Sequence, residues 1–227
     1  IIVSDIIRDL YDGAAMSTEV KLINTTTNSV EWLGFLEPCV YDQGWDEERE
    51  EMDLDCVDSL AAFKDIYYPN PSGVATFAEI LYTILHKDVR IKNLYISDNV
   101  QIASASANES VIERFRISQQ NFFDKKEDEN QADNEVAWNC FDVLSEMMQF
   151  LGYTMFMQGE NVYCVNYDAI KNGNAKYFKY DLSKGSLTNP TTVTLTSNKR
   201  IDAPEYSGNG TKVSLDDVYN FCSIKDD

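Results

Sequence analysis

Two consecutive apolar segments, joined by an acidic connection, constrain the fold of the N-terminal part of the chain most strongly. Residues 30–38 read Val-Glu-Trp-Leu-Gly-Phe-Leu-Glu-Pro, which places large apolar side chains on both faces of a strand. After the acid-rich stretch 42–51, residues 52–57 alternate apolar and acidic side chains, and this pattern predicts a strand with one core face. A helical turn is expected at 59–64. Gly34, which lies between large residues, predicts a β-bulge.

A hairpin is predicted directly before this region. Residues 18–24 alternate in polarity, which is typical of a strand. Residues 25–29 are rich in Thr, Asn and Ser and predict a turn that leads into a second strand at 30–36. Further upstream, Ser4 can cap a short amphipathic helix that Gly13 ends.

Two longer segments have the apolar spacing of amphipathic helices. Thr76 and Glu79 form a capping box ahead of the first, which continues to about Leu85. The second covers 137–151 and is ended by Gly152.

The other predicted elements are strands and connections. A hairpin is expected with strands at 153–158 and 161–166 around a two-residue turn. Local composition predicts several weaker strands, one segment of ambiguous structure and a charged linker. The weak strands are 94–96, 177–182, 191–196 and 211–215, the ambiguous segment is 108–118, and the linker is 124–134.

These patterns together predict an α+β fold with antiparallel, barrel- or sandwich-like sheet units and two main amphipathic helices. We expect an N-terminal sheet unit at 1–70, a helical and irregular middle with a charged linker at 71–133, and a helix-hairpin unit with further strands at 134–227. The 227 residues, 44% of them hydrophobic, are enough to bury a core.

Charge excludes several classes of function. A formal net charge of -19 disfavours attraction to nucleic acid or to anionic lipid, so sequence-specific DNA binding is not expected. No apolar run is long enough to span a membrane. The first residues, Ile-Ile-Val-Ser, lack a methionine and the features of a signal peptide, and they are typical of a fragment or a trimmed product.

The five cysteines are expected to be reduced, because their odd number and wide spacing fit neither a disulfide framework nor a zinc site. Cys56, Cys140 and Cys164 each lie on the apolar side of a local pattern and are predicted to be buried. The other two are Cys39 and Cys222.

No residue of the sequence is assigned a catalytic, cofactor-binding or metal-binding role. His86, the only histidine, ends a helix, where a cation faces the helix dipole favourably. Asp53, Asp55 and Asp58 offer oxygens for calcium, but they lack the glycine and distal Glu of a calcium loop and are expected to form an acidic face. Serine-hydrolase, zinc-protease and phosphate-loop motifs are missing, so no enzyme is predicted.

Three segments, in order, resemble structural proteins of the tail hub or baseplate in tailed bacteriophages and prophages of gut anaerobes. Residues 32–38 are similar to that family's aromatic-x-Gly-x-x-x-Pro strand. Residues 54–66 resemble its strand, Asp-Gly-Leu turn and Leu-Lys helix, with Ser59 where glycine is usual and Phe63 where leucine is usual. Residues 139–165 resemble its helix and hairpin, with a Gly-x-x-aromatic-x-Val return.

The resemblance covers about two thirds of the chain, residues 20–167. It implies a ring subunit at the end of the tail tube of a virion, assembled in the host cytoplasm. Its partners would be copies of itself and other tail proteins, with DNA passing through the channel. The 13 tyrosines suit such interfaces, and they suit sheet and core packing equally well.

Two other functions stay open. The main alternative is a cell-surface or secreted carbohydrate-binding module, which exposed aromatic side chains lining a sheet would favour. An acid-dependent hydrolase would need two facing carboxylates in a pocket, at least one with a perturbed pKa.

Overall fold

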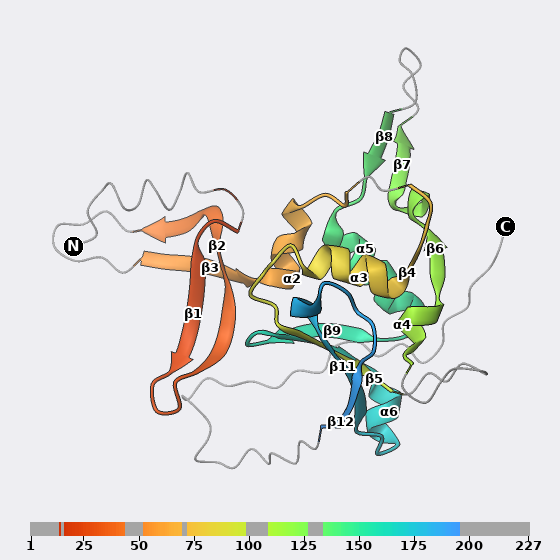
Figure 1. Ribbon diagram of the computed structural model, residues 1–227. Coiled ribbons are helices and arrows are strands. Elements are labelled where there is room, and N and C mark those ends of the chain that lie inside the picture. The colour runs from red at the N-terminus through yellow and green to blue at the C-terminus, as the bar shows by residue number, and fades with distance from the viewer. Residues whose placement is uncertain are drawn as a thin grey trace, which may run out of the picture. The chain divides into compact units, whose positions relative to one another are not determined.

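The computed structural model describes residues 14, 16–43, 52–69, 72–98, 109–126 and 134–195 (Figure 1). The chain divides into two compact units, 1–195 and 196–227, and all described residues belong to the first. The architecture is mixed α+β, as predicted. The sheets of the described residues contain three, five, two and two strands, and each has two open ends. The predicted barrel form is therefore not found in this part of the chain.

The first sheet confirms the N-terminal hairpin and the strand after it. Its strands are antiparallel, with the second strand in the centre. They are β1 (Glu19–Asn24), β2 (Ser29–Gln43) and β3 (Met52–Asp58). In the turn between β1 and β2, the Asn24 side chain accepts hydrogen bonds from the backbone N–H groups of Thr26 and Thr27. Asn28 then takes a left-handed conformation with φ of 57°, and this short-range polar chemistry closes the hairpin.

Strand β2 is buried from Leu33 to Leu36, which confirms that both of its faces are covered there. The predicted bulge at Gly34 is wrong, because the pairing of β2 with β1 and β3 is regular at this residue. The glycine instead allows close packing. A Cβ atom at this position would lie 2.2 Å from the Val57 carbonyl oxygen and 2.3 Å from the Trp32 ring. The register shifts at other points of the strand.

The largest sheet has the strand order β12-β11-β5-β10-β9. Its strands are β5 (Asn93–Ser97), β9 (Thr154–Gln158), β10 (Asn161–Val165), β11 (Lys176–Asp181) and β12 (Thr191–Thr194). The β9–β10 hairpin is confirmed. The β5–β10 pair is parallel and the others are antiparallel, so this sheet is mixed. Strand β5 pairs with β10 and β11, so the sheet crosses the unit boundary expected at residue 133.

The two main helices, α3 (Phe77–Leu85) and α5 (Cys140–Leu151), are confirmed. The capping box of α3 is formed in both directions between Thr76 and Glu79. Helix α5 begins three residues later than predicted, because Asn139 accepts a hydrogen bond from the Asp142 backbone and so caps it. Gly152 ends α5 with φ of 67°, as expected for a left-handed C-terminal residue.

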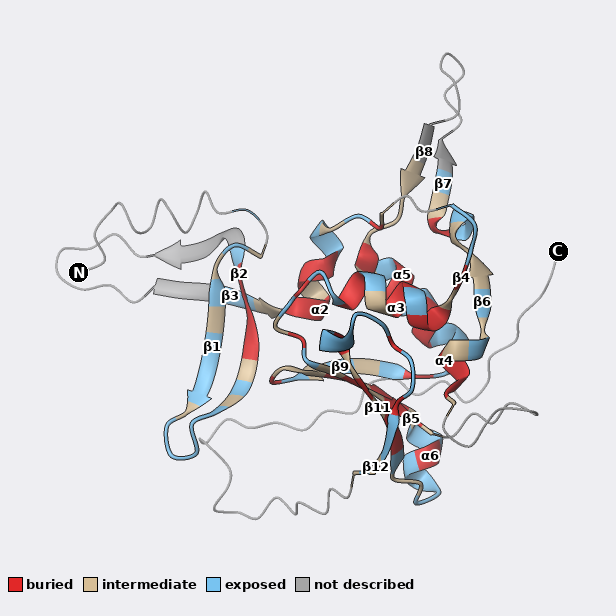
Figure 2. Cartoon of the chain, in the orientation of Figure 1, coloured by how far each residue is buried: buried red, intermediate tan, exposed pale blue. Residues whose placement is uncertain are grey.

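The core lies between these helices and one face of the five-stranded sheet (Figure 2). Side chains of both helices and of three central strands are fully or almost fully buried there, which accounts for most of the hydrophobic stabilisation. Among them are Ile80, Leu81, Ile84, Leu85, Val143, Met147, Leu94, Ile96, Val162, Cys164 and Tyr180.

Short elements connect and flank these layers. The helical turn expected at 59–64 is present as α2 (Ser59–Ala62) and the 3-10 helix η1 (Phe63–Asp65). The ambiguous segment forms a helix and a strand, and the ends of the predicted linker are strands that pair with each other, which corrects that prediction. These and the remaining elements are β4 (Val74–Thr76), α4 (Val111–Arg114), β6 (Arg116–Ser118), η2 (Gln119–Phe122), β7 (Phe123–Lys126), β8 (Asn134–Ala137), α6 (Tyr167–Lys171) and η3 (Leu182–Lys184).

The predicted helix near Ser4 and the strand at 211–215 lie outside the described residues. Among the residues that are described, no helix combines the length and apolar character needed to cross a membrane.

Candidate functional site

The structure describes two of the three acidic side chains that the sequence grouped together, Asp55 and Asp58. The Asp58 side chain accepts a hydrogen bond of 2.8 Å from the Ala61 backbone and caps α2. Asp55 is exposed, and the side chain of Asp53 lies outside the described part. No group of three or more metal-ligating side chains is present among the described residues. The aspartates of this strand therefore include a structural cap.

His86 lies at the C-terminal end of α3, as predicted, and it is exposed. Its ring stacks on Tyr82 at a centroid distance of 5.0 Å. This arrangement is a local packing contact on the helix surface.

Two of the three cysteines predicted to be buried are buried. Burial raises the pKa of Cys140 to about 11 and also raises that of Cys164, so both remain thiols at neutral pH. Cys56 is exposed, and its predicted burial is wrong because β3 is an edge strand, with β2 beside it on one side only in the described sheet. Cys39 and Cys222 have no described side chains.

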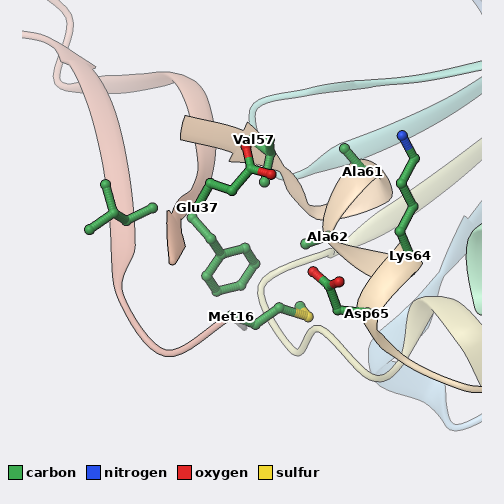
Figure 3. Close-up of a pocket in the computed structure, with 9 residues that line it drawn as sticks. Met16, Glu37, Val57, Ala61, Ala62, Lys64 and Asp65 are labelled. Atoms are coloured by element: carbon green, nitrogen blue, oxygen red, sulfur yellow. The ribbon is translucent and has the colours of Figure 1, made fainter. Parts of the chain in front are cut away.

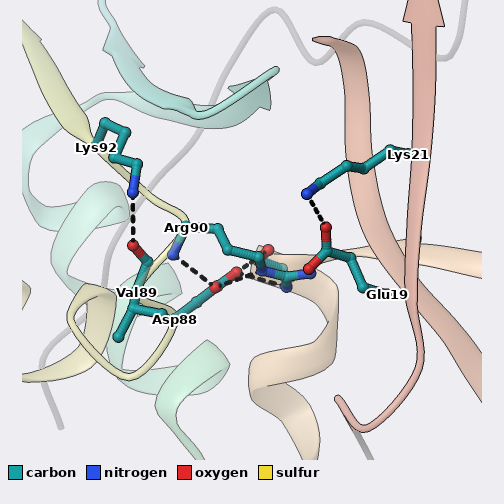
Figure 4. Close-up of polar contacts among 7 residues, drawn as sticks. Glu19, Lys21, Asp88, Val89, Arg90 and Lys92 are labelled. Atoms are coloured by element: carbon teal, nitrogen blue, oxygen red, sulfur yellow. Dashed lines mark hydrogen bonds and ion pairs between the residues drawn. The ribbon is translucent and has the colours of Figure 1, made fainter.

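A partly buried ionic cluster, here called the Arg90 junction, joins the three-stranded sheet to the rest of the unit (Figure 4). Arg90 donates to the Asp88 carboxylate through Nε at 2.8 Å and Nη2 at 2.9 Å. Ser59 donates to the same carboxylate from the start of α2. Arg90 Nη1 lies 3.2 Å from Glu19 of β1, and the guanidinium lies 3.7 Å from the ring centroid of Phe35 in β2.

The Arg90 junction keeps its acids charged. Burial disfavours the ionised form of Asp88, but hydrogen bonds from Arg90 and Ser59 outweigh it and leave the Asp88 pKa below its ordinary value. The pKa of Glu19 is lowered by the hydrogen bond from Lys21 and then by Arg90. Since the groups come from β1, β2, α2 and the α3–β5 connection, the junction fixes how these elements meet.

Two hollows adjoin the Arg90 junction: an open one of about 400 Å³, lined by Glu19, Asp88 and Arg90 among others, and a smaller one that does not have the size of a ligand site (Figure 3). The volume of the smaller one is about 110 Å³, whereas small-molecule sites usually have several hundred. Lys64 lines it, but its amine lies over the Phe141 ring, 4.8 Å from the centroid.

The face of the five-stranded sheet that is opposite the core carries two ordered rows of side chains. The pairing aligns four residues into what we call the aromatic row, which consists of Phe156, Tyr163, Tyr95 and Lys179. Two residues along each strand, on the same face, lies the polar row of Gln158, Asn161, Asn93 and Asp181.

Contacts within both rows are short. The rings of Tyr95 and Tyr163 stack at 4.8 Å and those of Tyr163 and Phe156 at 5.4 Å. Lys179 lies 5.7 Å from the Tyr95 centroid. In the polar row, Asn93 donates to the Asn161 side chain at 2.8 Å.

Hollows lie at both ends of these rows. The larger, of about 530 Å³, is open to solvent and lies between the β1–β2 and β9–β10 turns. The two turns approach closely, since a Cβ on Gly159 would lie 2.9 Å from the Val30 carbonyl oxygen. The smaller, of about 160 Å³, is lined by Lys179, Asp181 and Lys184 among others.

Sequence reasoning identified the strands of these rows but not the rows themselves. The alternation of Tyr95, Phe156 and Tyr163 with apolar neighbours was a usable signal for an outer face. Their alignment depends on pairing between strands far apart in the chain.

No family model, curated protein or solved structure matches this chain.

Proposed function

We propose that the chain is a structural subunit of a bacteriophage tail hub or baseplate. In this role, copies form a ring around the DNA channel and connect the tail tube to distal or receptor-binding parts. The observation that supports assembly best is the open edge of the three-stranded sheet.

Strand β1 exposes both backbone and apolar side chains at this edge. In the described part of the chain, β1 pairs with β2 on one side and with no strand on the other. Its residues Leu22 and Ile23 are 62% and 46% exposed. Proteins usually protect such edges with charge, proline or a covering element. Glu19 and Lys21 place charge on the first half of β1, so the apolar half at Leu22 and Ile23 is the part of the edge that favours addition of a strand from another chain.

The sheet has different strands at its two edges, which suits a ring. If β1 of one copy meets β3 of the next, the contact is heterologous, and repeating it closes a ring when the rotation permits. A fixed angle between the sheet and the rest of the subunit is then required, and the Arg90 junction provides one.

The charge of the chain is compatible with a DNA channel. A net charge of -19 repels phosphates, so a genome could pass without adhering to the wall.

The test is to place charge on the open edge. Ile23→Lys and Leu22→Lys should each leave folding intact and strongly reduce assembly, because a lysine on an edge strand opposes pairing. Light scattering after size-exclusion chromatography measures the mass, and electron microscopy shows whether rings form. Ile170→Lys is the matched control, because Ile170 is a similarly exposed isoleucine, at 51%, that lies on helix α6 and not on β1.

A wild-type chain that stays monomeric at the highest soluble concentration would contradict the proposal. So would rings that tolerate both edge substitutions. In particles of a phage whose genome encodes this chain, gold-labelled antibodies against the chain should bind at the end of the tail. Labelling elsewhere on the particle would contradict the assignment to the hub or baseplate.

A further inference from the structure

We propose that the outer face of the five-stranded sheet binds an unbranched, neutral oligosaccharide along the aromatic and polar rows. This binding site goes beyond the structural role, because the rows lie on the five-stranded sheet and the assembly edge belongs to the three-stranded one. The ligand class follows from the side chains that the face presents.

The aromatic row supplies apolar contact area that remains accessible. Phe156 is 41% exposed and lies on β9, an edge strand of the described sheet, at the end of the stack. Tyr163 and Tyr95 continue the row and are only partly buried. A sugar ring has an apolar face of C–H groups, which packs well on aromatic surface, and hydroxyl groups around its rim, which need polar partners.

The polar row supplies those partners two residues along each strand from the aromatic row. Asn93 and Asn161 share one hydrogen bond. Each amide carries two N–H donors and one carbonyl oxygen, so the pair keeps further groups for hydroxyls. The phenol groups of Tyr95 and Tyr163 can both donate and accept. Apolar and polar rows run parallel across the strands, as a ligand with an apolar face and a polar rim requires.

The dimensions favour a chain of sugars over a single one. The three stacked rings lie on three adjacent strands and Lys179 extends the row to a fourth, which at the usual strand spacing corresponds to about 14 Å. The hollow of about 530 Å³ at the β9–β10 end adds further room, within the usual range for ligand sites.

Charge distinguishes neutral from acidic ligands. Glu31 and Glu160 line the larger hollow, where no described lysine or arginine lines the wall. At the opposite end of the rows Lys179 and Lys184 lie beside Asp181, so the two glutamates of the larger hollow and the net charge of -19 are what disfavour uronic or sulfated sugars. Stacking that only stabilised the sheet would explain the ring contacts, but it would not require a row of amides and a hollow beside them.

Isothermal titration calorimetry on the full chain tests the proposal. The probes are soluble hexasaccharides of cellulose, xylan, amylose, laminarin, mannan and chitin, with a sulfated oligosaccharide as the acidic comparison. At least one neutral probe should bind. Phe156→Ala should weaken that binding about fivefold, as expected for loss of one aromatic contact, and Asn161→Ala should weaken it by a similar factor. Tyr167→Ala is the matched control, because Tyr167 on α6 is 65% exposed and outside both rows.

Circular dichroism checks that each variant is folded. Binding lost in Phe156→Ala and Asn161→Ala but kept in Tyr167→Ala supports the site, and the edge variant Ile23→Lys should bind as the wild type does, whether or not rings form. The proposal is overturned if the folded chain binds none of the neutral probes, or if Phe156→Ala changes the oligomeric state and leaves sugar binding unchanged, since the face would then be an interface between copies.

Discussion

The three-stranded and five-stranded sheets use similar strand sequences in different ways. The five-stranded sheet is covered on one face by α3 and α5, and its central residues Leu94, Ile96 and Val162 are fully buried. The three-stranded sheet buries mainly Leu33, Phe35 and Leu36, and it exposes Leu22 and Ile23 at its edge. Alternating polarity therefore specifies a strand in both places, while the covering elements decide whether its apolar residues form a core or a surface.

The difference has an energetic meaning. Burial of apolar area against two helices stabilises the five-stranded sheet directly. The three-stranded sheet depends more on a few contacts near its attachment, including the Arg90 junction. We expect the two regions to respond differently to matched substitutions.

A pair of leucine substitutions should show the largest contrast. Leu81→Ala empties a fully buried position in α3 and should lower the free energy of unfolding by about 3 kcal/mol. Leu22→Ala, at a position that is 62% exposed, should change the stability of the monomeric chain by less than about 0.5 kcal/mol. Urea denaturation followed by circular dichroism gives both values. Equal losses would mean that β1 is covered in solution.

Removing the ionic attachment should have the next largest effect. Arg90→Ala leaves the Asp88 carboxylate buried without its main partner, and this substitution should lower the free energy of unfolding by about 2 kcal/mol. Hydrogen exchange should become faster in β1 and β2 while α5 keeps its protection. Arg114→Ala, which removes a more exposed ion pair with Glu109, should cost less than about 1 kcal/mol. Faster exchange throughout the unit would show that the two regions unfold together.

Acid should weaken the Arg90 junction gradually, and by less than Arg90→Ala does. The folded-state pKa of Asp88 lies below its ordinary value, so its contribution to stability is present above the unfolded-state pKa of about 3.9 and is lost as pH falls through the folded value. Asp88→Asn should have a lower free energy of unfolding than the wild type at neutral pH. The difference between the two values should become smaller below about pH 4. Leu81→Ala removes no ionisable group, so its difference in free energy of unfolding from the wild type should not change with pH. If the difference for Asp88→Asn does not change with pH either, the ionic role of Asp88 is contradicted.

Much of the fold could be predicted from local sequence. The capping box at Thr76 and Glu79, the terminating Gly152 and the turn at Gly159 act within a few residues, and each ends or begins an element as expected. The bulge at Gly34 was wrong because the glycine makes room for a neighbouring strand and the Trp32 ring, which local spacing does not reveal.

The functional surfaces were less predictable because they depend on long-range pairing. Arg90 and Glu19 are distant in sequence and meet only when β1 lies against the α3–β5 connection. Tyr95 and Tyr163 stack because β5 and β10 are parallel neighbours. The apolar edge residues Leu22 and Ile23 were assigned to a strand correctly, but their exposure follows from which strand is central.

The position of β5 in the middle of its sheet has a consequence for biosynthesis. This strand leaves the ribosome well before β10 and β11, the two strands that flank it. Until they are translated, β5 and the apolar face of α3 have no sheet to join, so the nascent chain must stay unassembled or be shielded by chaperones. Translation that stops before β10 should therefore yield insoluble polypeptides.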